Sequence, residues 1–169
     1  MGGLVTPARS RWRSYTLMAA VWVLVLGVLY EGVERWLAPP RAQVLSTGTL
    51  QLQRHRDGHF YVDGAINGQT VRFLVDTGAS QIAISDVVAA QAGLVGGQIA
   101  TFHTANGPRQ GRLVRAAQVQ VGPWVVEQLT VGTGYTGRTP QEALLGQNFL
   151  RRVEVVMRGD TLLLRQVDK

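Results

Sequence analysis

The sequence contains no cysteine, only three histidines and no dense run of basic residues, although its formal net charge is +6 over 169 residues. Without cysteine, neither a disulfide nor a thiolate site can form. The spacing of His55, His59 and His103 matches no metal-binding pattern, so we predict no metal and no cofactor, and we assign His55 and His59 to a hairpin turn. The arginines are scattered, whereas nucleic-acid binding favours a dense basic patch with interleaved aromatic residues, so we expect no nucleic-acid partner.

Charged residues are also absent from Ser14 to Tyr30. This apolar run of about 17 residues is at the short end of what spans a bilayer as a helix. Aromatic residues bracket it, as they do at membrane interfaces, and Arg9, Arg11 and Arg13 precede it. Because positive charge tends to stay in the cytoplasm, the pattern predicts a single-pass protein of the inner membrane. Its N-terminus would be cytoplasmic and the rest of the chain periplasmic or otherwise extracytoplasmic.

Two other interpretations of this segment are open. A cleaved signal peptide would have a similar start and apolar centre, but no small-x-small cleavage pattern follows Tyr30. A buried core helix would show a polar face, and none is visible. We therefore expect a basic N-terminus, a transmembrane anchor, a linker and a folded domain, at residues 1–13, 14–36, 37–47 and 48–169 respectively.

Beyond the linker, the sequence is typical of a β domain. Asn67-Gly68 is a strong hairpin signal between two strands, the second of which ends at Asp76. Ser85 is a candidate N-cap for a short helix that stops at Gly93. A strand at residues 50–53 is expected to turn at Asp57-Gly58 and to return as a second strand at 60–62. Further strands are expected at 82–84, 99–103, 112–116, 118–121, 125–131, 153–157 and 161–164. Many short strands with regular turns predict an all-β fold, a small closed or partly closed barrel with one or two short helices.

The most informative stretch of the sequence is Phe73-Leu74-Val75-Asp76-Thr77-Gly78-Ala79-Ser80. It places a carboxylate at the end of an apolar strand, which is unfavourable unless neighbouring groups hold it. Gly78 lets the backbone approach closely and offers an unhindered N–H, and Thr77 supplies a hydroxyl that both donates and accepts. We therefore predict that Asp76 is kept for acid–base chemistry, in a loop supported by Thr77, Gly78, Ala79 and Ser80.

A second element follows downstream, Ala143-Leu144-Leu145-Gly146-Gln147-Asn148-Phe149-Leu150. The two elements in this order resemble the retropepsin-like (retroviral-type, single Asp-Thr-Gly) aspartic proteases of the membrane-anchored bacterial type. The resemblance covers roughly residues 48–167. It implies that Leu144, Leu145 and Gly146 run beside the active-site loop and lead into a short helix.

The resemblance implies hydrolysis of peptide bonds by two carboxylates that share one proton and activate a water molecule. This chain has one Asp-Thr-Gly sequence, so the second carboxylate must come from another copy. Asp76 and its mate would meet at the two-fold axis of a homodimer, with Thr77 of each copy interlocked beneath the site. The expected function is a membrane-anchored aspartic endopeptidase that cleaves a peptide or protein substrate.

Two alternatives stay open at this point. The first is a peptide-binding module on the same barrel that does not cleave. An intact Asp-Thr-Gly argues against it, because a binder has no need of a buried pair of carboxylates. The second is a membrane-tethered structural domain in which Asp-Thr-Gly is only a turn, and the downstream Leu144-Leu145-Gly146 element argues against that.

The segment from Ile99 to Ala116 resembles the flap of this family, a hairpin that closes over the substrate. Asn106-Gly107 is chemically a sound turn, although an ordinary surface hairpin would look the same. The candidate flap residues are Thr104, Ala105, Asn106 and Gly107.

Two features bear on how the substrate would be contacted. Ser80 stands where many retroviral relatives have a second acidic residue, which changes the expected contacts. Arg109, Arg112 and Arg115 could favour acidic substrates, but a solvated strand face also explains them.

Overall fold

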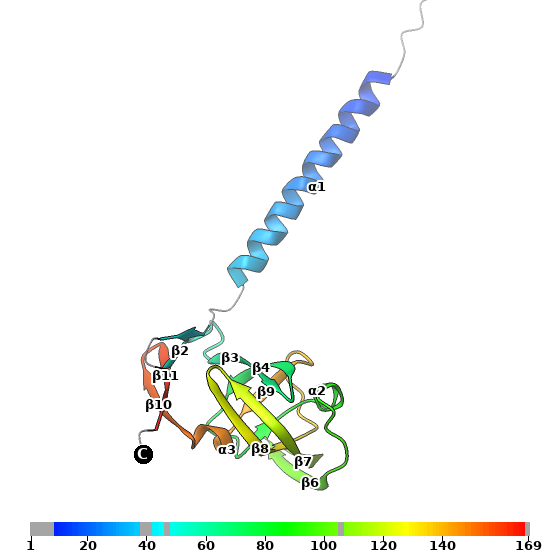
Figure 1. Cartoon of the computed structure of the whole chain (residues 1–169). Coiled ribbons are helices and arrows are strands. Elements are labelled where there is room, and N and C mark those ends of the chain that lie inside the picture. The colour runs from blue at the N-terminus through cyan, green and yellow to red at the C-terminus, as the bar shows by residue number, and fades with distance from the viewer. Residues whose placement is uncertain (1–8, 38–41, 46–47, 105–106, 168–169) are drawn as a thin grey trace, which may run out of the picture. The chain divides into compact units, whose positions relative to one another are not determined.

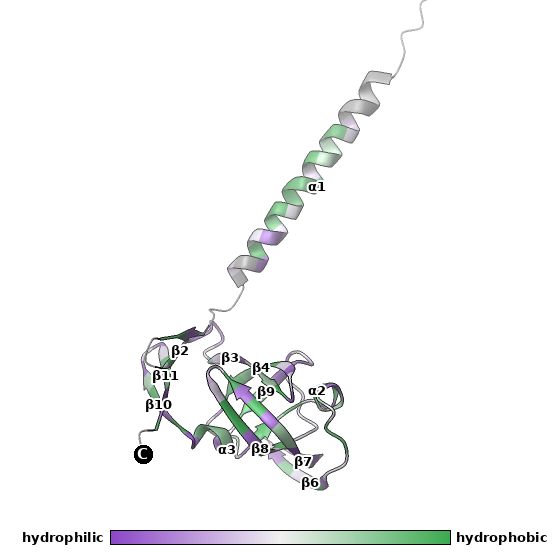
Figure 2. Ribbon diagram, viewed as in Figure 1, coloured by the Kyte–Doolittle hydropathy of each residue, from purple (hydrophilic) through white to green (hydrophobic). Residues whose placement is uncertain are grey.

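The structure is a computed structural model that describes residues 9–37, 42–45, 48–104 and 107–167 (Figure 1). The chain divides into two compact units, Met1–Pro39 and Pro40–Lys169. The first unit carries helix α1 (Arg9–Leu37). Within α1, Tyr15–Glu34 is long and apolar enough to cross a membrane, and the hydrophobic colouring of Figure 2 follows it. By length and composition, this helix could be a membrane span or a signal sequence.

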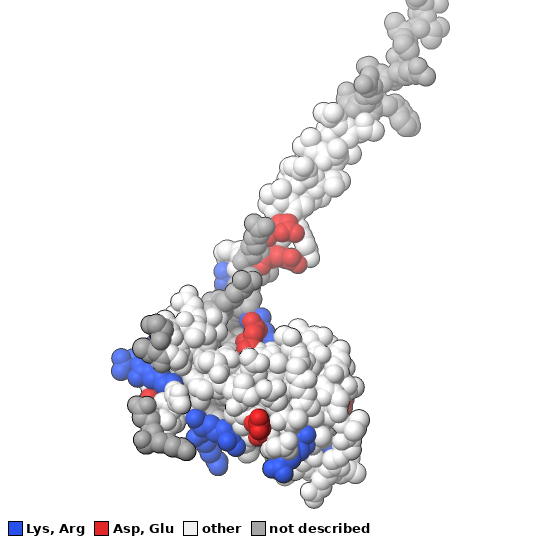
Figure 3. Space-filling model, in the orientation of Figure 1, with Lys and Arg blue, Asp and Glu red and all other residues white. Residues whose placement is uncertain are grey.

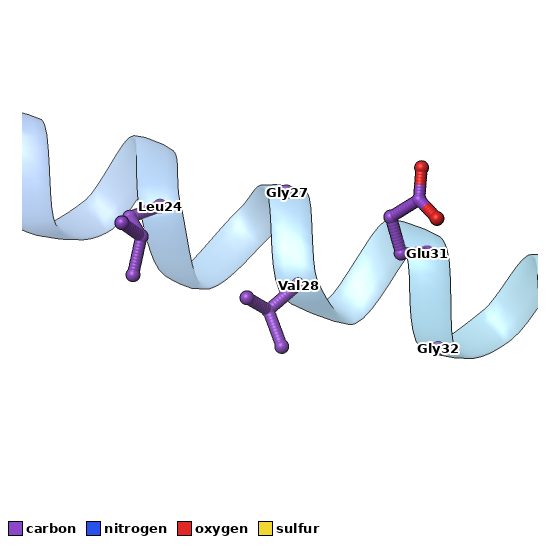
Figure 4. A pocket seen from close by; sticks show the side chains of 5 residues that line it. All are labelled: Leu24, Gly27, Val28, Glu31 and Gly32. Carbon is purple, nitrogen blue, oxygen red and sulfur yellow. The ribbon is translucent and has the colours of Figure 1, made fainter.

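A shallow groove runs along one face of α1 (Figure 4). Its lining residues are spaced three and four apart, which places them above one another on the helix. Two of them are glycines, so the floor of the groove is formed partly by backbone. The lining residues are Leu24, Gly27, Val28, Glu31 and Gly32.

The second unit consists mainly of strands, with two short helices, α2 (Asp86–Gln91) and α3 (Gln147–Leu150). The predicted all-β class is therefore confirmed. In chain order the strands are β1 (Gln43–Val44), β2 (Leu50–Gln53), β3 (Tyr61–Ile66), β4 (Gln69–Val75), β5 (Ile82–Ala83), β6 (Gln98–Thr104), β7 (Gly107–Val121), β8 (Trp124–Gly132), β9 (Glu142–Leu145), β10 (Val153–Arg158) and β11 (Thr161–Gln166).

The strands form two sheets, one of which closes on itself. The smaller sheet has the order β1-β2-β11-β10, and the larger has the order β3-β4-β9-β5-β8-β7-β6. Strand β3 also pairs with β7, where Ala65 lies opposite Gln120, so the larger sheet forms a ring with β6 outside it. This is the closed barrel that the turn pattern predicted.

The hydrophobic core fixes the strand that leads to Asp76. Along β4, Val71 and Phe73 are buried while Arg72 between them and Leu74 after them are partly exposed, which is the period of two expected for a strand. Phe73, Leu145 and Phe149 have no exposed surface and belong to one core cluster. The strand that leads to Asp76 is therefore held by core packing, and Leu145 and Phe149 of the downstream element belong to the same core.

Several local predictions are confirmed. Asn67 and Gly68 connect β3 to β4 with positive φ angles of 49° and 82°, as a two-residue hairpin turn requires. The Ser85 hydroxyl accepts a hydrogen bond of 3.1 Å from the Val88 N–H and caps α2. The His55 N–H bonds the His59 carbonyl at 2.7 Å, so these two histidines do close a turn.

Two strand predictions are wrong. Residues 50–53 do not pair with 60–62: β2 joins β11 instead, because its buried leucines match those of β11, with Leu52 opposite Leu162 and Leu50 opposite Leu164. Residues 112–116 and 118–121 are not separate strands, since β7 runs without a break through Ala117 for 15 residues. No turn-forming residue interrupts the sequence there, and β8 pairs with β7 on both sides of Ala117. Within the paired stretches 113–121 and 124–132, only Ala117 and Gln128, which has a positive φ of 53°, are left out of this pairing.

Candidate active site

Asp76 lies where β4 ends beside β9. The two strands are parallel, with Leu74 opposite Leu144 and Val75 opposite Leu145. The Asp76 N–H donates to the Leu145 carbonyl at 3.2 Å, which extends this pairing to the first residue of the loop. The carboxylate Oδ1 accepts the Gly78 N–H at 2.8 Å, as the sequence predicted for this glycine. Asp76 is half-buried, whereas Thr77 and Gly78 are exposed.

Helix α3 holds the remainder of the loop. The N–H groups of Gln147 and Asn148 donate to the carbonyls of Ala79 and Ser80 at 2.8 and 3.1 Å. The Gln147 side-chain amide donates to the Thr77 carbonyl at 3.0 Å. Asp76, Thr77, Ala79 and Ser80 are therefore each bonded to the downstream element, whereas Gly78 is bonded to Asp76.

Asn148 also clamps the loop to the barrel, a role that the sequence analysis did not assign. Its side-chain oxygen accepts the Ile82 N–H at 3.0 Å, and its amide donates to the Thr130 carbonyl at 2.7 Å. The only sequence signal was its place two residues after Gly146 of the Leu-Leu-Gly element.

Gly146 permits this close contact between the two elements. A Cβ atom built at this position would lie 2.3 Å from the Gln81 carbonyl oxygen and 2.4 Å from its carbon. Real Cβ atoms essentially never approach backbone so closely. The glycine is therefore required by the close approach of Gln81, the residue that follows the active-site loop. The residue before it, Leu145, accepts the Asp76 N–H.

A second carboxylate, missed from the sequence, organises the loop that follows β8. Glu142 is 6% exposed, and its Oε1 accepts the Tyr135 hydroxyl at 2.9 Å and the Arg138 N–H at 3.3 Å. Burial, followed by the hydrogen bond to Glu142, raises the pKa of the Tyr135 phenol; the charge of Asp76 adds to the effect. Residues 133–141 are here called the β8–β9 loop, and the Tyr135 N–H joins this loop to the carbonyl of Ile84 at 3.0 Å.

The far side of the β8–β9 loop is tied to the turn before β3. The carboxylate of Asp57 contacts the Arg138 guanidinium and accepts the Tyr61 hydroxyl at 2.9 Å and the His59 N–H at 2.9 Å. Partial burial acts to raise the pKa of Asp57, but these hydrogen bonds outweigh it and hold that pKa well below its usual range. Burial, and then the bond to Asp57, raise the pKa of Tyr61 to about 12.

Arg72 packs beside this group of residues. Its guanidinium lies 4.9 Å from the centre of the Tyr61 ring, a cation–π contact. Its buried Nε has no hydrogen-bond partner in the part of the chain that the structure describes.

The candidate flap is the hairpin of β6 and β7. Thr104 and Gly107 are joined by a hydrogen bond of 2.8 Å from the threonine hydroxyl to the glycine carbonyl. The other two predicted flap residues, Ala105 and Asn106, lie outside the described residues. The Arg109 guanidinium on β7 contacts the Thr136 hydroxyl in the β8–β9 loop. Among the described residues, no group of histidines and carboxylates is arranged to hold a metal ion.

Comparison with known proteins identifies the family. Residues 62–152, more than half of the chain, match the family model described as gag-polyprotein putative aspartyl protease. The chain belongs to the retropepsin-like aspartyl protease family, as the sequence motifs predicted.

Individual relatives agree with this assignment. The chain is 31% identical to a retropepsin-like aspartic protease from Rickettsia conorii of known crystal structure, with a TM-score of 0.57, over 69% of this chain and 89% of that one. It is 30% identical, over 98% of its own length and 79% of the relative's, to an uncharacterized protein in the cobV 5' region of Sinorhizobium sp. An uncharacterized protein of Rickettsia prowazekii (strain Madrid E) is 26% identical over 87% of this chain and 69% of its own.

Proposed function

We propose that the protein is a membrane-anchored aspartic endopeptidase whose catalytic dyad is Asp76 and the Asp76 of a second copy. The observation that carries this proposal is the state of the Asp76 carboxylate: half-buried at the end of a packed strand, with Oδ1 accepting a backbone N–H. An ionised carboxylate has about four lone-pair sites, so acceptor capacity is left for a water molecule and a second carboxyl group. The sequence supplies no second Asp-Thr-Gly, so the partner group comes from another copy.

In the proposed dimer, the two carboxylates lie across the two-fold axis and share one proton. Two like charges at this separation cannot both ionise, as is established for aspartic proteases, and the pair titrates as a unit. The ionised carboxylate takes a proton from a water molecule, whose oxygen attacks the peptide carbonyl carbon. The protonated carboxyl group gives its proton to the carbonyl oxygen. Collapse of the tetrahedral intermediate then breaks the C–N bond. The leaving nitrogen takes the proton that the first carboxylate removed from water, and the other carboxylate regains its proton from a hydroxyl of the intermediate.

The surrounding residues have matching roles in this proposal. Thr77 is exposed beside Asp76, so its hydroxyl is available to the same residue of the partner. The β6–β7 hairpin serves as the flap that closes over the peptide and excludes water. The protease domain comprises residues 48–169, and Leu144, Leu145 and Gly146 keep the active-site loop in place.

Helix α1 serves as the anchor. The stretch Tyr15–Glu34 has the length and composition of a span, and the arginines that precede it favour a cytoplasmic N-terminus. We therefore place the protein in the inner membrane, with the protease domain periplasmic or otherwise extracytoplasmic after a linker at 37–47. Anchoring restricts two copies to the plane of the membrane and raises their effective concentration, which favours a weak dimer.

A mixing experiment tests the dyad. The full-length protein in detergent is assayed against a peptide library, alone and after mixing and re-equilibration with increasing amounts of the Asp76→Asn variant. We expect the variant alone to lose about 100- to 10,000-fold in kcat/KM, the usual contribution of a general acid–base group. Since mixed dimers would hold one carboxylate, activity should fall more steeply than simple dilution predicts.

Two outcomes would contradict this proposal. Activity strictly proportional to the fraction of parent protein in the mixture would mean that each copy acts alone. Cleavage that is unchanged in Asp76→Asn would show that Asp76 takes no part in the chemistry. A folded dimer that binds peptides without cutting them would indicate the non-cleaving alternative. Replacing the exposed Asp63 with Asn provides a matched control, because this carboxylate lies on β3 outside the loop.

A further inference from the structure

The β6–β7 hairpin is positively charged and contains no acidic residue. From Val87 to Val126 the sequence has no Asp or Glu, yet it includes Arg109, Arg112 and Arg115. Lys and Arg side chains are visible over the region of β7 in Figure 3. A peptide that binds beneath this hairpin would therefore meet a positive potential.

Arg109 is the arginine of this group whose side chain contacts the β8–β9 loop. Two residues further along the same face of β7, Gly111 rests on the β8–β9 loop: a Cβ there would lie 2.1 Å from the Thr133 carbonyl oxygen. The Thr133 N–H also donates to the Arg112 carbonyl at 2.8 Å, which holds loop and strand together. Arg109 shares the face of Gly111 and contacts Thr136, the residue after Tyr135.

The position of Tyr135 relates this contact to the catalytic carboxylate. The Tyr135 N–H donates to the carbonyl of Ile84 at 3.0 Å, and Ile84 directly follows β5, the strand after the active-site loop. The charge of Asp76 is also one of the influences that raise the pKa of the Tyr135 phenol. The contact between Arg109 and Thr136 therefore joins the candidate flap to the β8–β9 loop, next to the residue that is bonded to Ile84 after the active-site loop.

The other arginines are engaged elsewhere. Arg112 donates to the Gly96 carbonyl at 3.1 Å, and Arg115 donates to the Gln128 carbonyl at 3.1 Å. Arg138 is paired with Asp57. The partner of Arg109 is an uncharged hydroxyl, and no ion pair joins it to a carboxylate within the described ranges. Its positive charge is therefore not neutralised at close range.

We infer that Arg109 is a specificity-determining residue that selects peptides with an acidic side chain close to the cleaved bond. This inference rests on the proposed function of the site. A guanidinium binds a carboxylate through two parallel charge-assisted hydrogen bonds, which are roughly twice as strong as neutral ones. A substrate carboxylate can therefore replace the Thr136 hydroxyl as the partner of Arg109.

The test compares peptides that differ at one position. A sequence cut by the full-length protein in detergent is resynthesised with Glu, Gln or Lys at each position around the cut. Cleavage is measured at pH 6, where the Glu side chain of the peptide is ionised. The enzymes are the parent, Arg109→Gln, Arg109→Lys and Arg109→Glu. Arg158→Gln is the matched control, because Arg158 is exposed on β10, away from the β6–β7 hairpin.

The expected result is a change of preference at one substrate position. The parent should favour Glu over Gln there by about two- to fivefold in kcat/KM, the size of a partly exposed ion pair. Arg109→Gln should abolish this preference, Arg109→Lys should retain part of it, and Arg109→Glu should favour Lys instead. Arg158→Gln should behave like the parent. An unchanged preference in Arg109→Glu, or no preference for Glu in the parent, would overturn the inference.

A binding measurement separates this inference from the proposed function. In the Asp76→Asn background, the affinity for fluorescent Glu and Lys peptides is measured by anisotropy, with and without Arg109→Glu. Suppose that the parent does not cleave, but that Arg109→Glu reverses the preference in binding affinity from the Glu peptide to the Lys peptide. This result would contradict the protease proposal and support the role of Arg109. If the parent cleaves peptides but the preference between Glu and Lys is the same with and without Arg109→Glu, the protease proposal is supported and the role of Arg109 is contradicted.

Discussion

Asp76 and Glu142 stand at the ends of two paired strands, yet their surroundings differ. Asp76 follows β4, is half-buried, and accepts the N–H of Gly78. Glu142 begins β9, is 6% exposed, and binds both the Tyr135 hydroxyl and the Arg138 N–H. Oε1 of Glu142 accepts two hydrogen bonds from its own loop, while Oδ1 of Asp76 accepts one and the carboxylate is more exposed to groups outside the chain. The difference separates a carboxylate that shapes the site from one that is available for chemistry.

The first prediction concerns Gly146, the residue that lets α3 approach the loop of Asp76. In Gly146→Ala, the added methyl would overlap the Gln81 backbone, which cannot rotate away as a side chain can. We expect a loss of about 3 kcal/mol in the free energy of unfolding, at the upper end for overpacking, measured by urea denaturation. Gly27→Ala, where nothing lies within 4 Å of the new methyl, should be close to neutral. A fully stable Gly146→Ala would mean that the contact is looser than described.

The second prediction contrasts the two carboxylates directly. Glu142→Ala leaves the Tyr135 hydroxyl and the Arg138 N–H without their acceptor, and should lower the free energy of unfolding by about 2 kcal/mol. Glu142→Gln keeps an acceptor oxygen and should recover part of this loss. Asp76→Asn, at a half-buried position, should change stability by less than about 0.5 kcal/mol while removing activity. If Asp76→Asn destabilised the protein more than Glu142→Ala, the comparison would fail.

The third and smallest effect concerns Asp57, which holds the opposite end of the β8–β9 loop through Arg138. Because the pKa of Asp57 is lower in the folded state than its ordinary value of 3.8, the ionised carboxylate adds stability above about pH 4. This contribution is lost as the pH falls from there through the lowered pKa. We expect Asp57→Asn to be about 1 kcal/mol less stable than the parent at pH 7.

The dependence on pH provides the check for Asp57. Thermal unfolding of the parent and Asp57→Asn is followed from pH 7 to pH 2, with the exposed Asp63→Asn as control. The difference between the parent and Asp57→Asn should shrink below about pH 4, since protonation removes the same charge that the substitution removes. A difference that stays constant over this range would show that the charge of Asp57 contributes little.

Local chemistry explains what could be predicted from the sequence. The Asn67-Gly68 turn, the Ser85 cap and the bond from Gly78 to Asp76 each depend on residues within a few positions of one another. The family resemblance added the neighbourhood of Gly146 and the active-site loop. The pairing of β2 with β11 was missed because a turn signal at Asp57-Gly58 says nothing about which sheet the next strand joins.

The residues that were missed act over long distances in the sequence. Asn148 contacts residues 82 and 130, and Arg138 contacts Asp57. Glu142 gave no signal either, because an acidic residue before an apolar strand usually lies in solvent. Only the folded structure shows that the β8–β9 loop wraps around it.

Strand β7 has a consequence for how this fold can vary in length. One end of it pairs with β6 in the candidate flap, and the other end pairs with β3 to close the ring. Because side chains alternate along a strand, a one-residue insertion between Leu113 and Gln118 would turn one end over relative to the other. Loops of this domain can therefore vary in length, but the number of residues between Arg109 and the β3–β7 pairing cannot change by one without turning side chains to the opposite face.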